Sequence, residues 1–176
     1  MLFRSGITTR ALQNLCKNSK KIVRVMPNLC AQVGESVNAY TSIGLSREEE
    51  SDIKGLLDSF GKSYVIDEIY FDTITGLTGS GPAYMFRFIK NMIECGVEGG
   101  LSFEQSRNMV LSVAIGSAKL LSSCECINGI QTMINNVCSK GGTTIEGIYA
   151  LDEGNFDEVS KSAVKSAIRR SKELGK

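Results

Sequence analysis

A change of pattern near residue 70 constrains the fold of this 176-residue chain more than any other feature. Before that point, short strand-like and helical runs alternate, whereas from Asp72 onward the apolar residues follow helical spacing. Alternating strands and helices are typical of an α/β sheet, but three short strands cannot cover their own faces. We therefore predict an α/β fragment over residues 1–70 and an all-α part over residues 71–176, in a mostly helical chain.

The elements of the two parts can be placed from local pattern. Ser102 with Gln105 predicts a capping box before an apolar helical stripe. The segment 83–97 carries an apolar arc wider than one packed face requires, which predicts burial on two sides and favours a homodimer interface as the second cover. The elements expected before residue 70 are a helix over 7–16, a strand over 21–26, a strand over 36–43, a helix over 46–60 and a strand over 63–68.

Composition argues against several classes of function. The formal charge of +1, without a dense Lys/Arg block, argues against a nucleic-acid surface, and no apolar run reaches the ~20 residues of a membrane span. Histidine is absent, which removes the commonest general base and the commonest zinc ligand. The six cysteines form no CxxC, and Cys124-Glu125-Cys126 alone is too close a pair to build a metal cage. We expect reduced intracellular thiols, a cytoplasmic protein and no metal site.

The stretch GSGPAY, residues 79–84, imitates the start of the dinucleotide fingerprint GxGxxG but ends on a tyrosine. The fingerprint is therefore absent from these 176 residues. Gly79 and Gly81 permit unusual backbone angles, and Pro82 suits the first turn of a helix. The stretch is either a kinked connection between two helical pieces or a place where backbone groups are exposed to a ligand.

The loop SKGGTTIEG, residues 139–147, opens a helix. A glycine pair lets backbone amides approach a ligand closely, and the unpaired amides at a helix start favour a negative charge such as a carboxylate. The alternative is a simple capping box in which Thr143 caps the helix and Glu146 completes the box. The residues alone leave both interpretations open.

The tripeptide Met26-Pro27-Asn28 follows the expected strand KIVRV. Polar groups just beyond the carboxyl end of a parallel strand are where α/β sheets bind ligands. A simple turn is the alternative, because Pro and Asn favour turns.

Three segments in the same order and at similar spacing make the chain resemble pyrroline-5-carboxylate reductase. The segments are VRVMPN, DTITGLTGSGPAYMF and VCSKGGTTIEGIYALDEGNF, and the only two prolines, Pro27 and Pro82, fall where the family's motifs have them. The resemblance runs from about Gly6 to Gly175 and covers the last two-thirds of such an enzyme.

The resemblance implies the last step of proline biosynthesis, in which NADPH or NADH reduces the C=N bond of 1-pyrroline-5-carboxylate to give L-proline. Residues 1–70 would be the C-terminal remnant of a Rossmann NAD(P)-binding domain. Residues 71–176 would be a helical dimerisation and substrate-binding domain that intertwines with a second copy in a homodimer or higher homo-oligomer.

The resemblance also implies roles for individual residues. Thr144 would be catalytic, supplying a hydroxyl to the ring nitrogen. The substrate carboxylate would be bound by Ser139, Gly141, Gly142, Thr143 and Thr144, and the nicotinamide end of the cofactor would lie against Met26, Pro27 and Asn28.

Some positions depart from the family pattern. Leu29 and Cys30 stand where the family usually has Thr and Pro, and Lys140 replaces a Pro of the substrate loop. The family's first strand and Gly-rich turn are missing before Met1, so we expect a truncated chain that is poorly active alone. Two alternatives remain open from the sequence: a non-catalytic helical dimerisation module, and a reductase of the β-hydroxyacid dehydrogenase type, whose usual catalytic lysine has no counterpart here.

Overall fold

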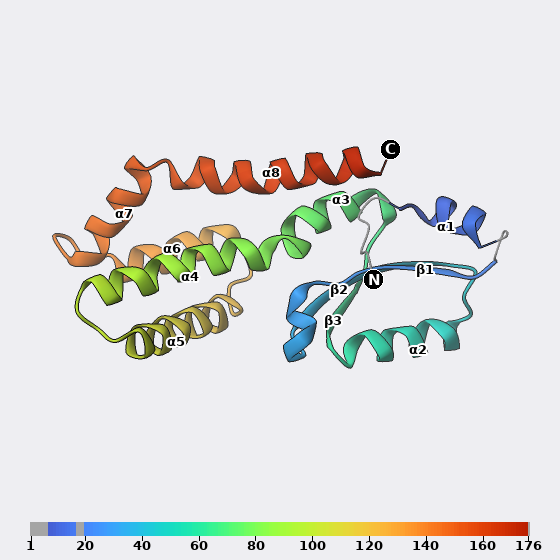
Figure 1. Cartoon of the computed structure of the whole chain (residues 1–176), viewed down its shortest axis with the longest axis horizontal. Helices are drawn as coiled ribbons and strands as arrows, with labels where there is room; N and C mark the ends of the chain where they lie inside the picture. The colour runs from blue at the N-terminus through green and yellow to red at the C-terminus, as the bar shows by residue number, and fades with distance from the viewer. Residues whose placement is uncertain (1–6, 17–19, 176) are drawn as a thin grey trace. The chain divides into compact units, whose positions relative to one another are not determined.

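The structure is a computed structural model that describes residues 7–16 and 20–175 (Figure 1). Its contacts form two compact units, one of residues 1–84 with 161–176 and the other of residues 85–160. The fold class expected from the sequence is confirmed, because a small sheet is followed by helices. The boundary expected near residue 70 separates two expected functions, whereas the two units are defined by their contacts. The expected boundary therefore stays a prediction.

The sheet of the first unit has three strands in the order β1 (Ile22–Met26), β2 (Ser36–Ile43) and β3 (Gly61–Val65). Strand β3 runs parallel to β2, but β1 runs antiparallel to it, with Met26 opposite Ala39. The expectation that Met26-Pro27-Asn28 follows a parallel strand is therefore wrong. The connection over residues 27–35 explains the difference, because a parallel crossover needs about a dozen residues or more.

The helices of this unit lie on both sides of the sheet. In Figure 1, α2 (Arg47–Asp58) lies on one side, and α1 (Thr9–Leu15) and α3 (Phe71–Ile74) lie on the other. Helix α2 begins at the capping box that Ser46 and Glu49 form. Strand β3 begins at Gly61, earlier than expected, and it also ends earlier, because the segment after Val65 leads into the 3₁₀ turn η2 (Glu68–Tyr70).

The core of this unit combines apolar side chains with buried polar ones, among them the pair of Ser36 and Asn38. Ala39, Tyr40, Leu57 and Phe71 are buried. Asn38 is fully buried, and it accepts a hydrogen bond from Ser36 Oγ at 2.6 Å while its Nδ2 donates to the carbonyl of Leu57 at 2.7 Å. The pair is therefore satisfied, and it fixes β2 against the end of α2.

The glycine-rich stretch after α3 forms a π-helical turn, η3 (Thr75–Gly79), before α4 (Gly81–Glu98) begins. Pro82 lies in the first turn of α4, so the expected junction of two helical pieces is confirmed. A side chain on Gly76 would come within 2.6 Å of Ile168 Cγ1 and 3.0 Å of the Val164 carbonyl oxygen. Glycine at this position therefore permits the close approach of α8 (Phe156–Leu174).

The second unit is helical, and all of its residues are described. It contains the later part of α4, then α5 (Phe103–Leu121), α6 (Ile127–Val137), α7 (Thr143–Glu153) and the start of α8. The capping box of Ser102 and Gln105 is confirmed, and Ser106 is buried with its hydroxyl donating to the carbonyl of Ile93 at 2.8 Å. The rings of Phe88 and Phe156 pack 5.9 Å apart.

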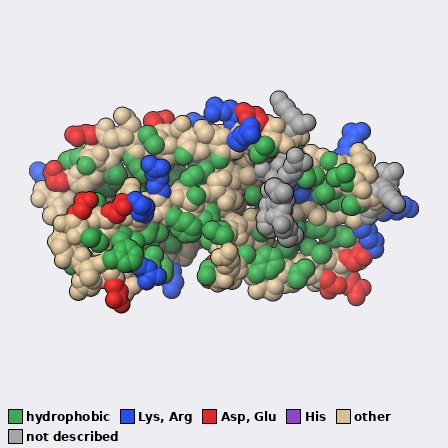
Figure 2. All heavy atoms as spheres, viewed as in Figure 1, with side chains coloured by type: hydrophobic (Ala, Val, Ile, Leu, Met, Phe, Trp, Pro, Cys, Tyr) green, Lys and Arg blue, Asp and Glu red, His purple; other side chains and the backbone are tan. Residues whose placement is uncertain are grey.

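Many large apolar side chains of the second unit stay exposed. Within residues 85–160, α4, α6 and α7 contain no buried residue, and α5 contains only Ser106. Figure 2 shows hydrophobic side chains exposed in the region of α4 and α5. The most exposed of them on these two helices are Met85, Phe86, Phe103, Met109, Val113, Ile115 and Leu120.

Across the described ranges, 7–16 and 20–175, no helix is both long enough and apolar enough to span a membrane.

Candidate functional site

Asn28, just after β1, makes three hydrogen bonds through its backbone N–H and its side chain, besides accepting from the backbone N–H of Ala31. Its backbone N–H donates to Ser36 Oγ at 3.1 Å, and its side-chain oxygen accepts from the backbone N–H of Cys30 at 3.1 Å. The second bond caps the 3₁₀ helix η1 (Leu29–Val33). The Asn28 Nδ2 donates to the carbonyl of Thr78 at 3.1 Å. Both ends of the amide are thus engaged within the protein, so Asn28 positions its neighbours.

The contact with Thr78 brings two of the three sequence motifs together inside the first unit. Thr78 belongs to the π turn η3, and the adjacent Gly79 lies so close to Met26 that a Cβ there would be 2.6 Å from Met26 Cε. The end of β1 therefore rests directly on the glycine-rich junction before α4. Single π turns within helices are frequent at functional sites.

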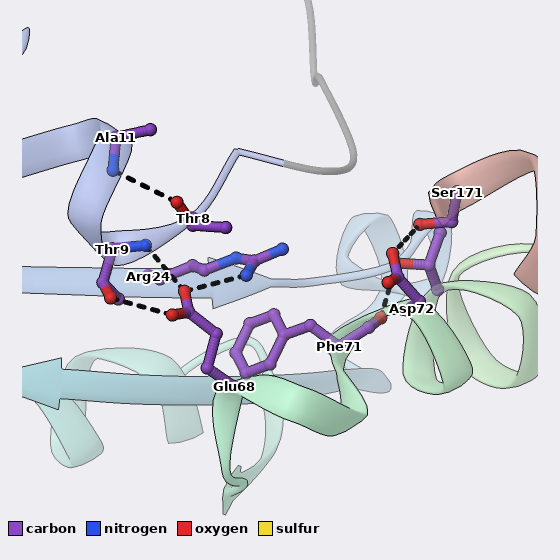
Figure 3. A network of polar contacts seen from close by, with 9 residues as sticks. Thr8, Thr9, Ala11, Arg24, Glu68, Phe71, Asp72 and Ser171 are labelled. Atoms are coloured by element: carbon purple, nitrogen blue, oxygen red, sulfur yellow. Dashed lines mark hydrogen bonds and ion pairs between the residues drawn. The ribbon is translucent and has the colours of Figure 1, made fainter. Parts of the chain in front are cut away.

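Arg24, two residues before Met26, anchors β1 in a polar network (Figure 3). Its Nη1 lies 2.9 Å from Glu68 Oε1, and its guanidinium stacks 4.3 Å above the ring of Phe71. Glu68 also accepts from the backbone N–H of Thr9 at 2.6 Å and from its hydroxyl at 2.9 Å. The Arg24 side chain is only 12% exposed, so this pair is better shielded from water than a surface ion pair.

The network also sets the charge state of Glu68. Burial acts to raise the pKa of this carboxyl, but the backbone N–H of Thr9, the Arg24 guanidinium and the Thr9 hydroxyl together outweigh burial. The pKa of Glu68 is therefore lower than its ordinary value. The ionised carboxylate of Glu68 lies against Thr9, the first residue of α1. Its negative charge therefore also compensates the backbone amides at the start of that helix, which have no partner within the helix.

A shallow cavity of about 340 Å³ lies beside this network. Asp72 lines it and accepts from Ser171 Oγ of α8 at 2.6 Å, which ties the C-terminal helix to the segment that leads into the π turn. The other lining residues are Thr8, Arg24, Glu68, Ile69, Phe71, Lys172 and Gly175. Its four charged lining groups are two cations and two anions, and this balance favours neither a cationic nor an anionic ligand.

The loop that precedes α7 forms a turn, and each of its two glycines is required for a different reason. The Ser139 carbonyl accepts from the Gly142 N–H at 3.0 Å, and Gly141 has a φ of 71°, which other residues adopt at a cost. A Cβ on Gly142 would collide with Ser139 Oγ and lie 3.1 Å from the Ser139 carbonyl oxygen. The loop is therefore compact, and its backbone approaches its own Ser139 closely.

The start of α7 contradicts one of the two interpretations of the sequence, the capping box. Gly142 is the N-cap residue with an extended backbone, and the helix has no side-chain capping hydrogen bond. The expected box of Thr143 and Glu146 is wrong, because Thr143 is already helical and cannot take the cap position. Thr143 and Thr144 are the first two helical residues, so their amides have no partner within α7.

The candidate residues fall in two units. Met26, Pro27 and Asn28 belong to the first unit, where they meet the π turn. The loop residues 139–144 belong to the second, with Thr144 half-buried and Lys140 exposed. The sequence did not reveal Thr78 as a partner of Asn28. Thr78 accepts the hydrogen bond through its backbone carbonyl, which a residue of any type would provide.

Comparison with known proteins identifies the family. The family described as pyrroline-5-carboxylate reductase dimerisation matches residues 68–174, more than half of the chain. The chain therefore belongs to the pyrroline-5-carboxylate reductase family. This finding favours that family over the β-hydroxyacid dehydrogenases considered from the sequence.

Individual relatives agree with this assignment. The chain is 42% identical to pyrroline-5-carboxylate reductase of Aquifex aeolicus, over 97% of this chain and 64% of the relative, and 37% identical to that of Glycine max, over 97% and 61%. It thus spans slightly less than two-thirds of these curated relatives. Among solved structures, Plasmodium falciparum pyrroline carboxylate reductase with NADP bound aligns with a TM-score of 0.91 at 32% identity, over 98% of this chain and 69% of that one. The enzyme from Streptococcus pyogenes aligns with 0.88 at 31%, over 96% and 65%.

Proposed function

We propose that the chain takes part in the NADPH- or NADH-dependent reduction of 1-pyrroline-5-carboxylate to L-proline. The observation that carries the proposal is the start of α7, where Gly142 caps the helix without a side-chain hydrogen bond and leaves the first amides open. Open amides and the positive end of the helix dipole suit a carboxylate, which this substrate carries. The family membership supports the same substrate.

Different residues of the loop would bind different groups of the substrate. The turn of Ser139, Gly141 and Gly142 keeps side chains away from the helix start, so that the amides of Thr143 and Thr144 can approach the substrate carboxylate. The half-buried Thr144 hydroxyl then hydrogen-bonds the ring nitrogen. Binding through both groups fixes the face and the position of the C=N carbon, which is the main contribution a protein can make to this reaction.

The cofactor supplies a hydride when it is bound. Met26 and Pro27 fit its nicotinamide end, because both are half-buried and present apolar surface beside the π turn. Asn28 holds this edge in place through Thr78 rather than offering its own amide. The 176 residues carry no GxGxxG fingerprint, so the fit concerns the nicotinamide end alone.

We further propose that a second copy of the chain covers the exposed apolar side chains of α4 and α5. Contiguous exposed apolar surface marks an interaction site on soluble proteins, and closed homodimers are the commonest assembly that covers it. The match to a dimerisation family supports this arrangement. It also keeps a second candidate function open, in which residues 71–176 act only as a dimerisation module.

The Thr144 hydroxyl provides the test of the reductase function. The chain would be joined to the preceding third of the Aquifex aeolicus relative, and oxidation of NADPH by pyrroline-5-carboxylate would be followed for the parent, Thr144→Ala and Thr144→Ser. We expect Thr144→Ala to lower kcat by at least about tenfold, with partial rescue by Thr144→Ser, because positioned proton donors contribute about 10²–10⁴-fold. Equal rates for all three proteins would remove Thr144 from the mechanism.

Binding of L-proline to the 176-residue chain, measured by calorimetry, separates the two candidate functions. A reductase loop binds the product through its carboxylate, whereas a dimerisation module forms the dimer without binding proline.

A further inference from the structure

Two cysteines and a methionine lie near one another in sequence and structure around α6 in the second unit. Cys124 lies between α5 and α6, Cys126 is the N-cap residue of α6, and Met133 lies further along that helix. The Cys124 thiol contacts Met133 Sδ at 3.4 Å. A point above Gly129, where a Cβ would stand, lies 3.2 Å from Cys124 Sγ and 3.7 Å from Cys126 Sγ. The two thiols therefore flank the same small space.

Helical geometry places Cys126, Gly129 and Met133 on the same side of α6. Residues 126, 129 and 133 recur at helical spacing and share one face of α6. Because residue 129 is glycine, it adds no side chain to the space beside the two thiols. The Cys126 side chain makes no capping hydrogen bond to the helix, so its sulfur is not occupied by that role. Cys124 and Met133 are half-buried and Cys126 is exposed, which leaves the space accessible from solvent.

We propose that Cys124, Cys126 and Met133 form a binding site for Cu(I) with three sulfur ligands. Thiolates and thioethers are soft ligands that select Cu(I), and a thioether among them argues against a structural zinc site, which is built from four Cys or His ligands. The described residues contain no group of three or more His, Cys, Asp or Glu that could hold a metal ion, so the site depends on the Met133 sulfur as its third ligand. The pair Cys124-Glu125-Cys126 is too small a cage alone, and the fold adds Met133 as the third ligand.

Binding one Cu(I) to this site is a ligand exchange without oxidation or reduction. Two S–Cu bonds replace two S–H bonds, and the two thiol protons pass to solvent. The Met133 sulfur adds its lone pair and loses no proton. The site would join the segment after α5 to the middle of α6.

A competition titration tests the site. The reduced 176-residue chain is mixed, without oxygen, with Cu(I) held by a coloured chelator, and the loss of colour measures copper transfer to the protein. We expect one Cu(I) per chain. Cys124→Ser and Cys126→Ser should each weaken binding by at least about tenfold, since even outer partners of a metal site contribute about 10–100-fold. Met133→Leu keeps the volume but removes the sulfur, and should also weaken binding.

Cys16→Ser is the matched control, because it removes an exposed thiol from the other unit and should leave binding unchanged. Equal copper transfer to Cys126→Ser and to Cys16→Ser would overturn the proposal. Cys126 is exposed, so its serine variant tests the site even where Cys124→Ser fails to fold, with circular dichroism as the check.

X-ray absorption of the selenomethionine-substituted protein gives an independent result. A Cu–Se distance that disappears in Met133→Leu supports the three-sulfur site, and a shell of nitrogen or oxygen neighbours contradicts it.

Discussion

Gly142 shows how one residue can decide the character of a helix start. Its extended backbone takes the cap position, and its missing side chain lets Ser139 lie against it. A serine or threonine at the cap would satisfy an amide of α7 with its own hydroxyl. With glycine in that position, the amides stay open to a ligand, which is the property that the proposed carboxylate site requires.

Gly142→Ala should therefore weaken binding of L-proline to the chain. The added Cβ would meet both the hydroxyl and the carbonyl oxygen of Ser139, and overpacking of this kind costs about 1–3 kcal/mol. We expect the turn to shift and the affinity measured by calorimetry to fall by about tenfold, which corresponds to about 1.4 kcal/mol.

Gly147→Ala is the matched control for this loop. It adds the same methyl group within α7, where nothing lies within 4 Å, and it should stabilise the helix by up to about 1 kcal/mol. If the two alanine variants bound proline equally well, the loop would not be the carboxylate site.

At the scale of elements, the polar network around Glu68 joins three segments that are distant in sequence. One carboxylate compensates the first amide of α1, pairs with Arg24 on β1 and belongs to η2. The stack of Arg24 on Phe71 continues the connection toward the π turn. The network thus fixes the strand whose end carries Met26 and Asn28.

The lowered pKa of Glu68 predicts how the stability of this unit depends on pH. A carboxyl whose pKa is lower in the folded than in the unfolded state stabilises the protein above the unfolded value of 4.5. This contribution is lost as the pH falls through the folded pKa. Glu68→Gln should therefore be less stable than the parent at neutral pH, and the difference should shrink below pH 4.5.

Amide hydrogen exchange of α1 and β1 measures this difference within the first unit. Glu125→Gln, which changes an exposed carboxylate of the other unit, is the control and should follow the parent at every pH. A difference between Glu68→Gln and the parent that stays constant with pH would contradict the role assigned to the ionised carboxylate.

Elements that depend on neighbouring residues were predictable from the sequence, whereas contacts between distant residues were not. The strand over 36–43 and the capping box of Ser102 and Gln105 were predictable, because periodicity and caps act over a few neighbouring residues. The direction of β1 was missed, although the short connection after it already favours an antiparallel neighbour. The contact of Asn28 with Thr78 joins residues fifty positions apart. It was not predictable, because the acceptor is a backbone carbonyl and does not depend on the residue type.

For the whole molecule, the question is what covers the apolar surface of the second unit. Phe86 on α4 is 55% exposed, and it belongs to the apolar arc that the sequence predicts to be buried on two sides. If another copy covers this arc, Phe86 is exposed only in the free chain. A charge at this position would then cost little in the monomer and much in the dimer, because an unpaired buried charge is strongly unfavourable.

Phe86→Asp should therefore shift the protein from dimer to monomer while its helical circular dichroism stays unchanged. Light scattering across a dilution series measures the shift, and we expect the dimer dissociation constant to rise by at least about a hundredfold, or about 2.7 kcal/mol. Lys90→Gln is the control on the same helix, because Lys90 is exposed and only pairs with Glu94 in solvent. A dimer of unchanged strength in Phe86→Asp would place the interface elsewhere, since the aspartate then remains in water in both states.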